Sequence, residues 1–596
     1  MQGGMETGNS IADILSGKRT PCGKLADTWA ERYEDYPSHD TYSYRNGNPH
    51  EEDYLEGIYV GYRWFNINDI KARYPFGYGL SYTEFSKKCE KITVEKGIVT
   101  CAISIKNIGD YAGKEVVQIY LSAPNDKLIK EKVSLSGFAK TKCLQPDEKQ
   151  VLNVVFNLRD FASYDEKRAM FVLEKGEYIL YLGENAEDLT PIGVLVADRE
   201  IITEKCKNVC PMKNEIAFFN PPINEREIPD LQRILIDADD INCITHEYAK
   251  PVHIDEKRVN DVVEKLSALD LINFLVGTSY VGGVRNTVFG AGGYSTSAYL
   301  KYGVPNMPMT DGPQGINITP KSLKPKQNFL NMPALPETLQ YGFTGWLAKR
   351  SAPKENDRRK VFYQYGTAFP SEVLVAQTWD LELAKEQGRA VGEEMKEFGV
   401  VFWLAPAMNI HRNPLCGRNY EYYSEDPYLT GKFAAAVTSG VQEYKGCFVT
   451  LKHFVCNNLE TDRNLSSSNL DERTLREIYL KGFKIAIRES DAKGVMASYN
   501  KVNGVYLPNN YELLTDVLRN EFGFDGMVMT DWFATGHDES LSENCCKAGC
   551  DIIMPGLPAE VKKIQKAYKN GTITKNDIEI SARRVIKAAL ESHVTV

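Results

Sequence analysis

The 596-residue sequence has no apolar run long enough to cross a lipid bilayer, so we expect no membrane-spanning helix and no membrane partner. Positive charge is also scarce, since 71 Lys and Arg residues face 80 Asp and Glu residues and leave a net charge of −9. This balance argues against nucleic acid as a partner. The first residues, MQGGME, have neither a basic segment nor an apolar core, so we expect no secretory signal and a cytoplasmic location.

A disulfide framework is not expected either, because the 13 cysteines are odd in number and widely scattered. Two groups contain residue types that bind metals: Cys206, Cys210, Cys243, His246 and His253 in one, and Cys545, Cys546 and Cys550 in the other. The first group fits no standard zinc spacing, and the second lies in a predicted helix that runs into a strand. We therefore favour buried or incidental thiols in a reducing compartment and expect no metal.

The chain is too long for one typical domain, and its character changes several times. Residues 1–32 contain one short amphipathic helix, predicted at 9–16, with nothing before it to bury its apolar face. Residues 33–85 are rich in Tyr, Gly, Asn and Pro, which predicts a loop-like connector. The aromatic stretch 74–82 indicates that this connector packs over another surface, since an exposed linker would be more polar.

The next region predicts a β-sandwich over residues 86–201. Short strands at 99–105, 116–121, 151–156 and 178–182 are separated by turn residues, and no helical period appears between them. Residues 202–255 are polar and carry Pro221, Pro222 and Pro251, which predicts a linker or strap.

Residues 256–596 alternate between predicted strands and predicted helices. The helices are expected at 266–275, 383–398, 433–444, 472–489, 511–521 and 581–591, and the strands at 306–310, 400–404, 448–451, 494–498, 527–529 and 551–554. Repeated strand–helix units of this size predict a parallel sheet or a barrel. Polar residues cluster just after the strands, where the loops at one barrel end would bring them together.

The strand predicted at 527–529 ends in Thr530, Asp531 and Trp532. At the catalytic end of a parallel barrel, a carboxylate can attack the anomeric carbon of a sugar and an indole can pack on the sugar ring. The alternative for Asp531 is a helix cap, a common position for aspartate.

Several motifs together resemble glycoside hydrolase family 3, the β-glucosidase and β-xylosidase family. They are TDGPQG at 310–315, GRNYE at 417–421, SEDP at 424–427, KHF at 452–454, Asn457 and Asn458 with Glu460 and Arg463, SYN at 498–500 and TDW at 530–532. The resemblance implies a multidomain α/β plus all-β protein, with a TIM-like (β/α)8 barrel at the C-terminus. A fibronectin type III-like β-sandwich precedes the barrel. A short remnant of an α/β-sandwich domain stands at the N-terminus, as in a domain-inverted subgroup of the family.

The resemblance also implies roles for individual residues. Asp531 matches the nucleophile, and the substrate-binding residues would be Asp311, Arg418, Lys452, His453, Arg463, Tyr499 and Trp532. For Asp311 a turn or cap is the alternative, and for Arg418 an ion pair with Glu421 or Glu425. No cofactor is implied, because two carboxyl groups suffice for glycoside hydrolysis. The expected partners are small β-glucosides or oligosaccharides.

One expected group has no match in the sequence. The family's acid/base carboxyl usually comes from the α/β-sandwich domain, upstream of the region that resembles residues 9–16, and no acidic residue here matches it. The function we expect is a retaining exo-β-glycosidase, with β-glucosidase first, impaired by this gap. A catalytically deficient sugar-binding fragment and β-xylosidase specificity remain open, and the unburied apolar face predicts association, for instance as a homo-oligomer.

Overall fold

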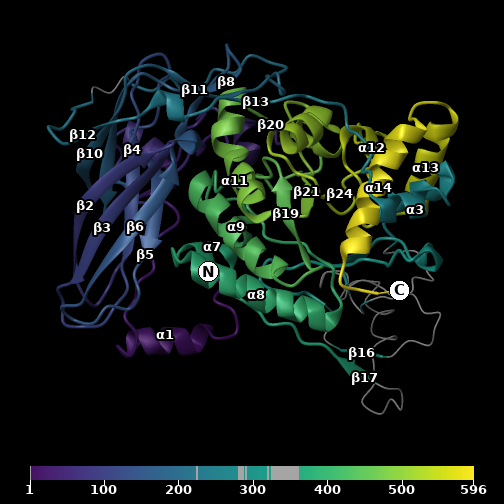
Figure 1. The fold of residues 1–596 in the computed structure, drawn as a ribbon, viewed down its shortest axis with the longest axis horizontal. Coiled ribbons are helices and arrows are strands. Elements are labelled where there is room, and N and C mark those ends of the chain that lie inside the picture. The colour runs from purple at the N-terminus through teal and green to yellow at the C-terminus, as the bar shows by residue number, and fades with distance from the viewer. Residues whose placement is uncertain are drawn as a thin grey trace.

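A computed structural model describes residues 2–222, 226–278, 288, 291–318, 321–323 and 361–595. Residue 1, residues 223–225 of the expected linker and parts of the expected barrel range 256–596 lie outside the described residues. Figure 1 shows the sheets of the first half of the chain on one side and a mixed region of helices and strands on the other. No helix of the described part combines the length and apolar character needed to span a membrane.

The predicted β-sandwich region consists of two antiparallel sheets that face each other. One has the order β2–β3–β6, and the other contains β10–β9–β4–β5. In β3, every second residue from Val99 to Ile105 is fully buried, so the alternation in the sequence sets which face packs inward. The bounds are β2 Phe85–Glu95, β3 Ile98–Asn107, β4 Val116–Ser122, β5 Ser134–Lys140, β6 Lys149–Asn157, β9 Gly176–Gly183 and β10 Leu189–Ala197.

The expected linker, residues 202–255, contributes short strands to these sheets. β12 (Arg233–Leu235) adds a parallel edge strand to β10. β11 (Ile201–Lys205) and β13 (Ile244–Thr245) join β8 (Met170–Leu173) and β7 (Ser163–Asp165) in a separate four-stranded sheet. These strands are too short to show a clear alternation in the sequence, which is why the segment resembled a plain linker.

The second half of the chain is built around one sheet of six strands. In order they are β14 Gly293–Tyr294, β15 Pro308–Thr310, β18 Phe402–Trp403, β19 Phe448–Phe454, β21 Gly494–Ala497 and β24 Met527–Thr530. Each neighbouring pair is parallel except β14–β15. Parallel bridges join Met529 to Ile552 and Ile553 to Val276, and the Thr278 N–H donates to Tyr294 O at 3.1 Å. These contacts connect the two edges of the sheet into a ring.

Residues 551–554, expected to form a strand, form only these single bridges. The cause is the buried Asp551 carboxylate, which accepts the backbone N–H of Val528 at 2.9 Å and so replaces part of the backbone ladder. Arg519 and Arg584 hold the same carboxylate at 2.8 and 2.9 Å.

Helices cover the ring on its outside (Figure 1). The main ones are α3 Lys257–Val263, α7 Glu372–Ala376, α8 Leu381–Phe398, α9 Pro427–Gln442, α11 Lys481–Ser490, α13 Pro558–Lys569 and α14 Lys575–Glu591. Helices α8 and α9 approach closely at Gly388 and Gly440, where a Cβ atom would come within 2.2 and 2.1 Å of backbone oxygens on the other helix. The Phe138 ring of β5 stacks on Phe433 of α9 at 6.2 Å and so joins the sandwich to the ring.

Three expected helices differ from the prediction, and one of them, expected at 511–521, is a π-helix, η10 (Glu512–Glu521). Residues 266–275 form a short helix, α4 (Ala268–Leu271), followed by a 3-10 turn, η5 (Ile272–Phe274). Residues 472–489 are divided into α10 (Glu472–Thr474), a π-helical turn, η8 (Leu475–Tyr479), and α11. The wider turn brings the Arg476 side chain inward, where it pairs with buried Glu472 and Glu521.

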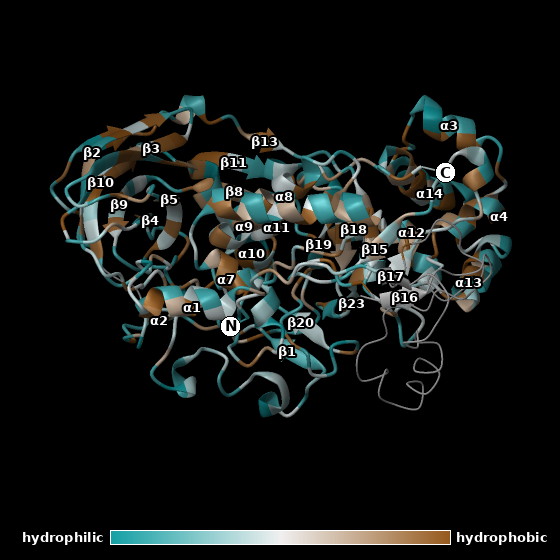
Figure 2. Cartoon of the chain, turned by 90° about the horizontal axis from the view of Figure 1, so that it is seen from below, coloured by the Kyte–Doolittle hydropathy of each residue, from teal (hydrophilic) through white to brown (hydrophobic). Residues whose placement is uncertain are grey.

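The N-terminal region contains more regular structure than a loop-like connector. β1 (Glu51–Asp53) pairs in parallel with β20 (Ser467–Asn469), and α2 (Tyr62–Ile67) buries Tyr62 and Phe65. Of the aromatic stretch 74–82, Phe76 is fully buried against Tyr62 and Trp379, whereas Tyr74 and Tyr82 are 37% and 45% exposed, so only part of it packs over another surface. By contrast α1 (Thr7–Leu15) has no buried residue, and Figure 2 shows it on the outside of the fold.

Candidate active site

The Asp531 carboxylate lies directly after β24, at the carboxyl end of the parallel strands, and the residue is only 7% exposed. Its Oδ1 accepts the backbone N–H of Trp532 at 2.6 Å. Its Oδ2 lies 3.6 Å from His453 Nε2 and receives no hydrogen bond from any described residue. One carboxylate oxygen is therefore fixed and the other is available, which suits a nucleophile better than a helix cap.

The charge of Asp531 is set by two opposing effects. Burial raises the pKa of its carboxyl, and the positive charges of Arg418 and Lys452 lower it without fully cancelling the effect of burial. The ionised carboxylate is thus kept reactive in a poorly solvated position by nearby cations.

Asp311 and Lys452 form an ion pair at the edge of this group. Lys452 Nζ lies 2.7 Å from Asp311 Oδ1, and its side chain is 3% exposed, whereas the Asp311 side chain is 58% exposed. Desolvation raises the pKa of Asp311, but the charge and hydrogen bond of Lys452 outweigh it and hold the pKa below its ordinary value. The lysine forms the floor, and the carboxylate faces outward, where it can accept hydrogen bonds from a diol.

His453 is held by its backbone as well as by its ring. His453 lies within β19 and not just after it. The Asn409 side chain binds both backbone groups of His453. Its Nδ2 donates to His453 O at 2.9 Å, and its Oδ1 accepts the His453 backbone N–H at 2.8 Å. Burial, with Arg418 and Lys452 nearby, lowers the pKa of His453 well below its ordinary value. A neutral imidazole therefore faces Asp531.

Tyr499, Arg463 and Trp532 line the other side. The Tyr499 hydroxyl donates to Trp532 O at 2.9 Å, and it also lies close enough to the Asp531 carboxylate to lower the pKa of that group. The Arg463 guanidinium lies 4.5 Å from the centre of the Tyr499 ring. The Trp532 indole N–H donates to Gly292 O at 2.9 Å, which fixes the ring beside Asp531.

The sequence offered an ion pair of Arg418 with Glu421 or Glu425 as the alternative to substrate binding, and the structure shows such a pair with one of them. Arg418 contacts Glu421. Glu425 is instead a buried acceptor for the connector, where it takes the backbone N–H groups of Thr28 and Tyr62, both at 2.8 Å. Because Arg418 also influences the pKa values of Asp531 and His453, the ion pair and a role in the site are compatible.

The structure adds two acidic neighbours to which the sequence analysis assigned no role. Glu460 lies 2.9 Å from Arg463, while its Oε1 is buried without a hydrogen-bond partner among the described residues. Burial raises the pKa of Glu460. Glu372, the first residue of α7, accepts the Ala407 N–H at 2.9 Å, and burial, together with the charge of Glu421, raises its pKa well above the ordinary value. Glu460 stands in a quoted motif, but no sequence signal marks Glu372 or Asn409.

The two cysteine groups have different outcomes. Cys545, Cys546 and Cys550 are all buried free thiols. Of the first group, the structure brings Cys206 and His246 together, with Glu204 as a third neighbour, and leaves Cys243 exposed. This cluster is remote from Asp531 in the chain. It lies on the four-stranded sheet β13–β11–β8–β7, called the linker sheet below.

Family comparisons match three parts of the chain. The profile of the "Glycosyl hydrolase family 3 C-terminal domain" matches residues 1–82, that of the "Fibronectin type III-like domain" residues 115–186, and that of the "Glycosyl hydrolase family 3 N terminal domain" residues 351–588. The C-terminal-domain profile thus comes first in the chain and the N-terminal-domain profile last, an order inverted relative to the usual arrangement.

Individual relatives cover nearly the whole chain. It is 36% identical to Beta-glucosidase A of Butyrivibrio fibrisolvens over 95% of this chain and 69% of that protein. It is 34% identical to a Beta-glucosidase of Ruminococcus albus over 99% of this chain and 60% of that protein. A solved β-glucosidase from Paenibacillus barengoltzii superposes with a TM-score of 0.80 at 30% identity, over 99% of this chain and 64% of that one. The chain thus spans 60–69% of the length of these relatives.

Proposed function

Because the chain belongs to glycoside hydrolase family 3, we propose that its site hydrolyses terminal, non-reducing β-D-glucosyl residues with retention of configuration. The observation that carries the proposal is the Asp531 carboxylate, buried at the end of β24 with one oxygen held by a backbone N–H and the other available. The relatives named β-glucosidase support glucose as the sugar.

The proposed reaction has two displacements at the anomeric carbon. An Asp531 oxygen forms a bond to C1 while the glycosidic C–O bond breaks and the aglycone leaves. Water then attacks C1 of the glycosyl ester and releases the Asp531 carboxylate, so the configuration is retained overall. Asp311 and Lys452 would bind sugar hydroxyls, and Trp532 would pack on the ring of the bound sugar. Arg418 would stabilise the ionised nucleophile.

A second carboxyl group is needed about 5–5.5 Å from the nucleophile to protonate the leaving oxygen and later to deprotonate water. The neighbouring carboxylates Asp311, Glu421 and Glu460 are each paired with a cation, Lys452, Arg418 and Arg463. Lys452 holds the pKa of Asp311 below its ordinary value, which makes that carboxyl a poor proton donor. Burial raises the pKa values of Glu460 and Glu372, but neither residue matches the acid/base motif of the family. We therefore infer that this chain by itself is impaired as an acid/base catalyst.

The impairment has a measurable size, because loss of general acid–base help typically lowers rates by roughly 10²–10⁴-fold. Natural β-glucosides should be hydrolysed slowly. 4-Nitrophenyl β-glucoside should form the glycosyl-enzyme readily, because its leaving group barely needs a proton. The covalent intermediate on Asp531 should then accumulate and be detectable by mass spectrometry of the intact chain.

The test is the turnover of 4-nitrophenyl β-glucoside with and without azide, which attacks the glycosyl-enzyme without a general base. A slow reaction that azide accelerates supports both the nucleophile and the missing acid/base. A fast reaction that azide does not change contradicts the impairment. In that case Glu460 is the carboxyl to replace first, because burial raises its pKa and its Oε1 has no partner among the described residues.

The second candidate function is sugar binding without turnover. The ion-paired carboxylates favour it, while the available oxygen of Asp531 speaks against it. Calorimetry that detects glucose binding together with no release of nitrophenol would favour this candidate. A panel of nitrophenyl glycosides would separate glucosidase from xylosidase specificity.

We also propose the domain layout that the strand pairings suggest. Residues 1–32 would be a remnant of an α/β-sandwich domain, 33–85 a connector, 86–201 a fibronectin type III-like sandwich, 202–255 a linker and 256–596 a TIM-like (β/α)8 barrel. The ring of parallel pairs supports the barrel, with β14 as an antiparallel member. Homo-oligomer formation and a cytoplasmic location remain predictions from the sequence.

A further inference from the structure

We propose that Glu204, Cys206 and His246 form a zinc site on the linker sheet, outside the glycosidase site. One ligand atom from each residue, a carboxylate oxygen, the thiol sulfur and a ring nitrogen, lies within 4.8 Å of the other two. This is the combination of O, S and N donors that Zn²⁺ accepts in proteins.

Strand register explains why these three side chains meet. Glu204 lies in β11 and Cys206 directly follows the last residue of that strand, Lys205, so the two side chains, two residues apart in extended chain, point to the same face. In the parallel pair β11–β13, Glu204 is opposite Ile244 and Lys205 is opposite Thr245, so the next step along both strands places Cys206 beside His246. The His246 N–H donates to Lys205 O at 3.2 Å and holds this register beyond the last paired residue.

The distances suit a shared metal. Glu204 Oε2 and His246 Nε2 are 3.0 Å apart. The edges of a zinc tetrahedron with these donors are about 3.3–3.8 Å long, as follows from metal–ligand bonds of about 2.0–2.3 Å. A metal ion would replace the proton between carboxylate and imidazole with a small outward shift, and the Cys206 sulfur would move in from the third side.

The surroundings already have the features of a second shell. The other oxygen of Glu204 accepts a hydrogen bond from Lys484 Nζ at 2.6 Å, and Arg488 lies 3.4 Å away. These contacts orient the carboxylate, as outer partners commonly do at metal sites. The Glu204 and His246 side chains are only 3% and 6% exposed, so these two metal-binding groups have little contact with solvent.

The positive charges of Lys484 and Arg488 oppose a cation, so binding needs a ligand that gains a negative charge. Cys206 is a free thiol with one proton on its sulfur. Zn²⁺ would displace that proton, because a coordinating thiol is deprotonated. The thiolate and the Glu204 carboxylate then offset the two charges of the ion, whereas the charges of Lys484 and Arg488 are no longer offset by Glu204 and weaken binding.

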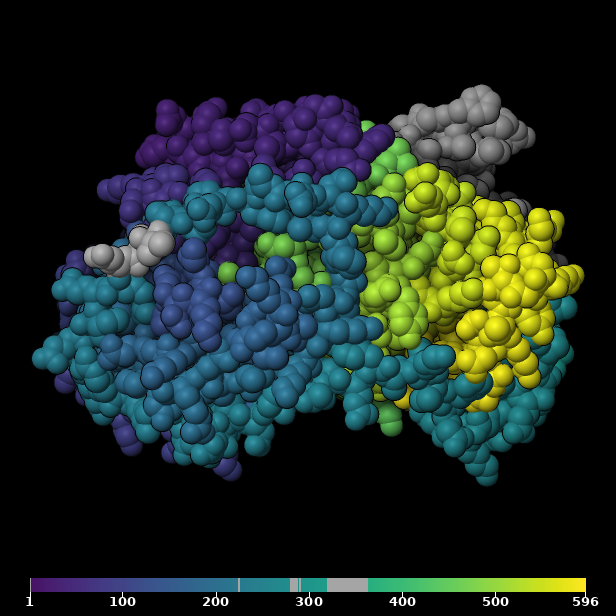
Figure 3. Space-filling view, turned by 90° about the horizontal axis from the view of Figure 1, so that it is seen from above, coloured from purple at the N-terminus to yellow at the C-terminus, as the bar shows by residue number. Residues whose placement is uncertain are grey.

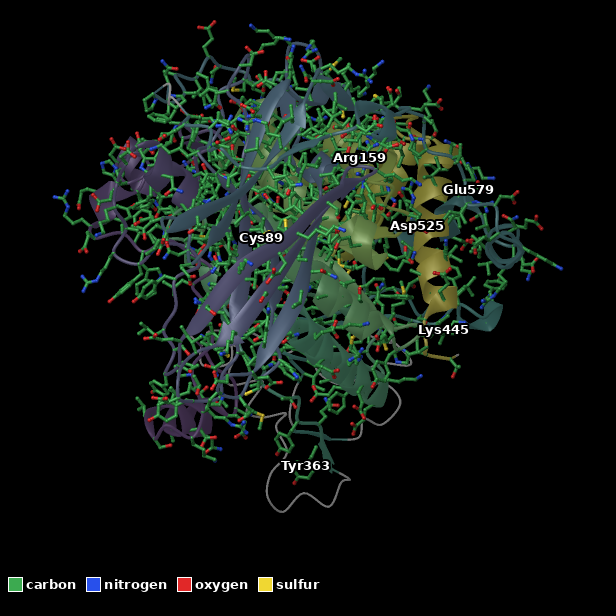
Figure 4. All side chains as sticks on the ribbon, turned by 60° about the vertical axis from the view of Figure 1, so that its left-hand side comes forward. Cys89, Arg159, Tyr363, Lys445, Asp525 and Glu579 are labelled. Atoms are coloured by element: carbon green, nitrogen blue, oxygen red, sulfur yellow. The ribbon has the colours of Figure 1, made fainter. Side chains whose placement is uncertain are left out.

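The position suggests what the ion would do. Lys484 and Arg488 belong to α11, which covers the catalytic ring, whereas Arg159 of the sandwich region, labelled in Figure 4, donates to Thr203 O on β11 at 2.9 Å. Figure 3 shows the teal linker between the blue sandwich and the green and yellow part of the chain. A metal here would fasten the linker at a point where both halves of the molecule meet it.

The experiment uses the whole chain, stripped with EDTA and titrated with Co²⁺, which reports a thiolate ligand through a charge-transfer band in the near ultraviolet. We expect the band to grow to one equivalent and Zn²⁺ to displace it. Cys206→Ser should abolish the band, and His246→Gln should weaken Zn²⁺ binding at least tenfold. Cys243→Ser is the matched control, because this thiol lies close by on the same segment but is exposed, and it should leave the band unchanged.

Two results would overturn the proposal. One is a wild-type chain that shows no cobalt–thiolate band although its circular dichroism is that of a folded protein. The other is a band that survives in Cys206→Ser or disappears in Cys243→Ser, since another thiol would then be the ligand. A melting temperature that rises with Zn²⁺ for the wild type and not for His246→Gln would support the proposed fastening role independently of the cobalt spectrum.

Discussion

The floor of the glycosidase site and the surface around α1 differ in almost every physical respect. Around Asp531, the charged side chains are paired within the chain, as in the buried Lys452 with the more exposed Asp311. Around α1, a groove is lined largely by apolar side chains and reaches across α1, the connector and α7 to α8, with Ile11, Leu25, Leu80 and Leu374 among its lining residues. The floor thus depends on interactions within the chain, whereas the groove exposes a surface that those interactions leave uncovered.

Because of this difference, we expect turnover and self-association to be changed by mutations in different regions. The connector links the two regions through buried ion pairs, such as Arg412 with Glu52 and Glu56. Yet α1, only a few tens of residues earlier in the chain, has no buried residue. Mutations on the floor should change turnover and not association, and mutations in the groove should do the reverse.

The largest effect should come from Asp531→Asn. Removing the proposed nucleophile should lower kcat with 4-nitrophenyl β-glucoside by roughly 10⁴-fold or more, as found when covalent nucleophiles are replaced. The measurement is nitrophenol release under saturating substrate, with mass spectrometry to confirm that no glycosyl-enzyme forms. Asp525→Asn is the matched control, because this carboxylate lies just before the same strand and is 55% exposed. Retained turnover in Asp531→Asn would remove the nucleophile assignment.

Asp531→Asn should also stabilise the fold, so that turnover falls while stability rises. The pKa of Asp531 is raised in the folded chain, so its contribution to stability is fully present below the unfolded carboxyl pKa of about 3.9 and is lost as pH rises through the folded value. At neutral pH the ionised carboxylate therefore costs folding free energy, and Asn avoids that cost. Thermal unfolding at pH 7 should give a higher Tm for Asp531→Asn, and a lower Tm would contradict the raised pKa.

A smaller loss is expected from Lys452→Met. A hydrogen bond between charged groups contributes about 1.5–3 kcal/mol, which corresponds to a fall in kcat/KM of roughly 10–150-fold if substrate binding depends on the Asp311–Lys452 pair. Asp311→Asn should cost a similar amount. The double variant should lose much less than the product of the two single losses, because the pair acts as one unit. Losses that multiply would show that the two residues bind substrate independently.

The acid limb of the pH–rate profile offers the next test. Asp531 must be ionised to attack, so kcat/KM should fall as pH drops through its raised pKa. Arg418 lowers that pKa, and Arg418→Gln should therefore move the acid limb to higher pH in addition to reducing the rate. Arg389→Gln, an exposed arginine paired with Glu443, is the control and should leave the limb in place. A limb that does not move would place the titrating group elsewhere.

The sequence marks the residues that line the site better than the residues that hold them in place. Asp531, Lys452 and Tyr499 follow or end apolar strands in recognisable motifs, and the parallel pairing of those strands brings them together. Asn409 and Glu372 have no motif, and each acts through a hydrogen bond to a backbone group distant in the chain. Such contacts depend on the folded geometry of loops, which periodicity does not describe.

The same limit appears in the fold. Long alternating strands such as β3 and the long amphipathic helix α8 were predictable, because their patterns extend over many residues. The two- and three-residue strands β12 and β13 were not, and neither was the replacement of backbone pairing by the Asp551 carboxylate. The meeting of Cys206 and His246 follows from one of these short pairings, which is why spacing alone argued against it.

The smallest effect on turnover should come from the groove, where the effect on association should be largest. Ile11, Leu15 and Leu80 are 53%, 78% and 69% exposed, and apolar surface of this kind favours contact with a second copy. Sedimentation velocity should detect oligomers of the wild type at tens of micromolar and fewer in Ile11→Glu/Leu80→Glu, with nitrophenol release unchanged. Val151→Glu, at an equally exposed valine of the sandwich region, should leave the distribution as it was. A compact wild-type monomer would mean that the groove is tolerated in water, and a loss of turnover in the groove variant would show that the groove and the glycosidase site are coupled.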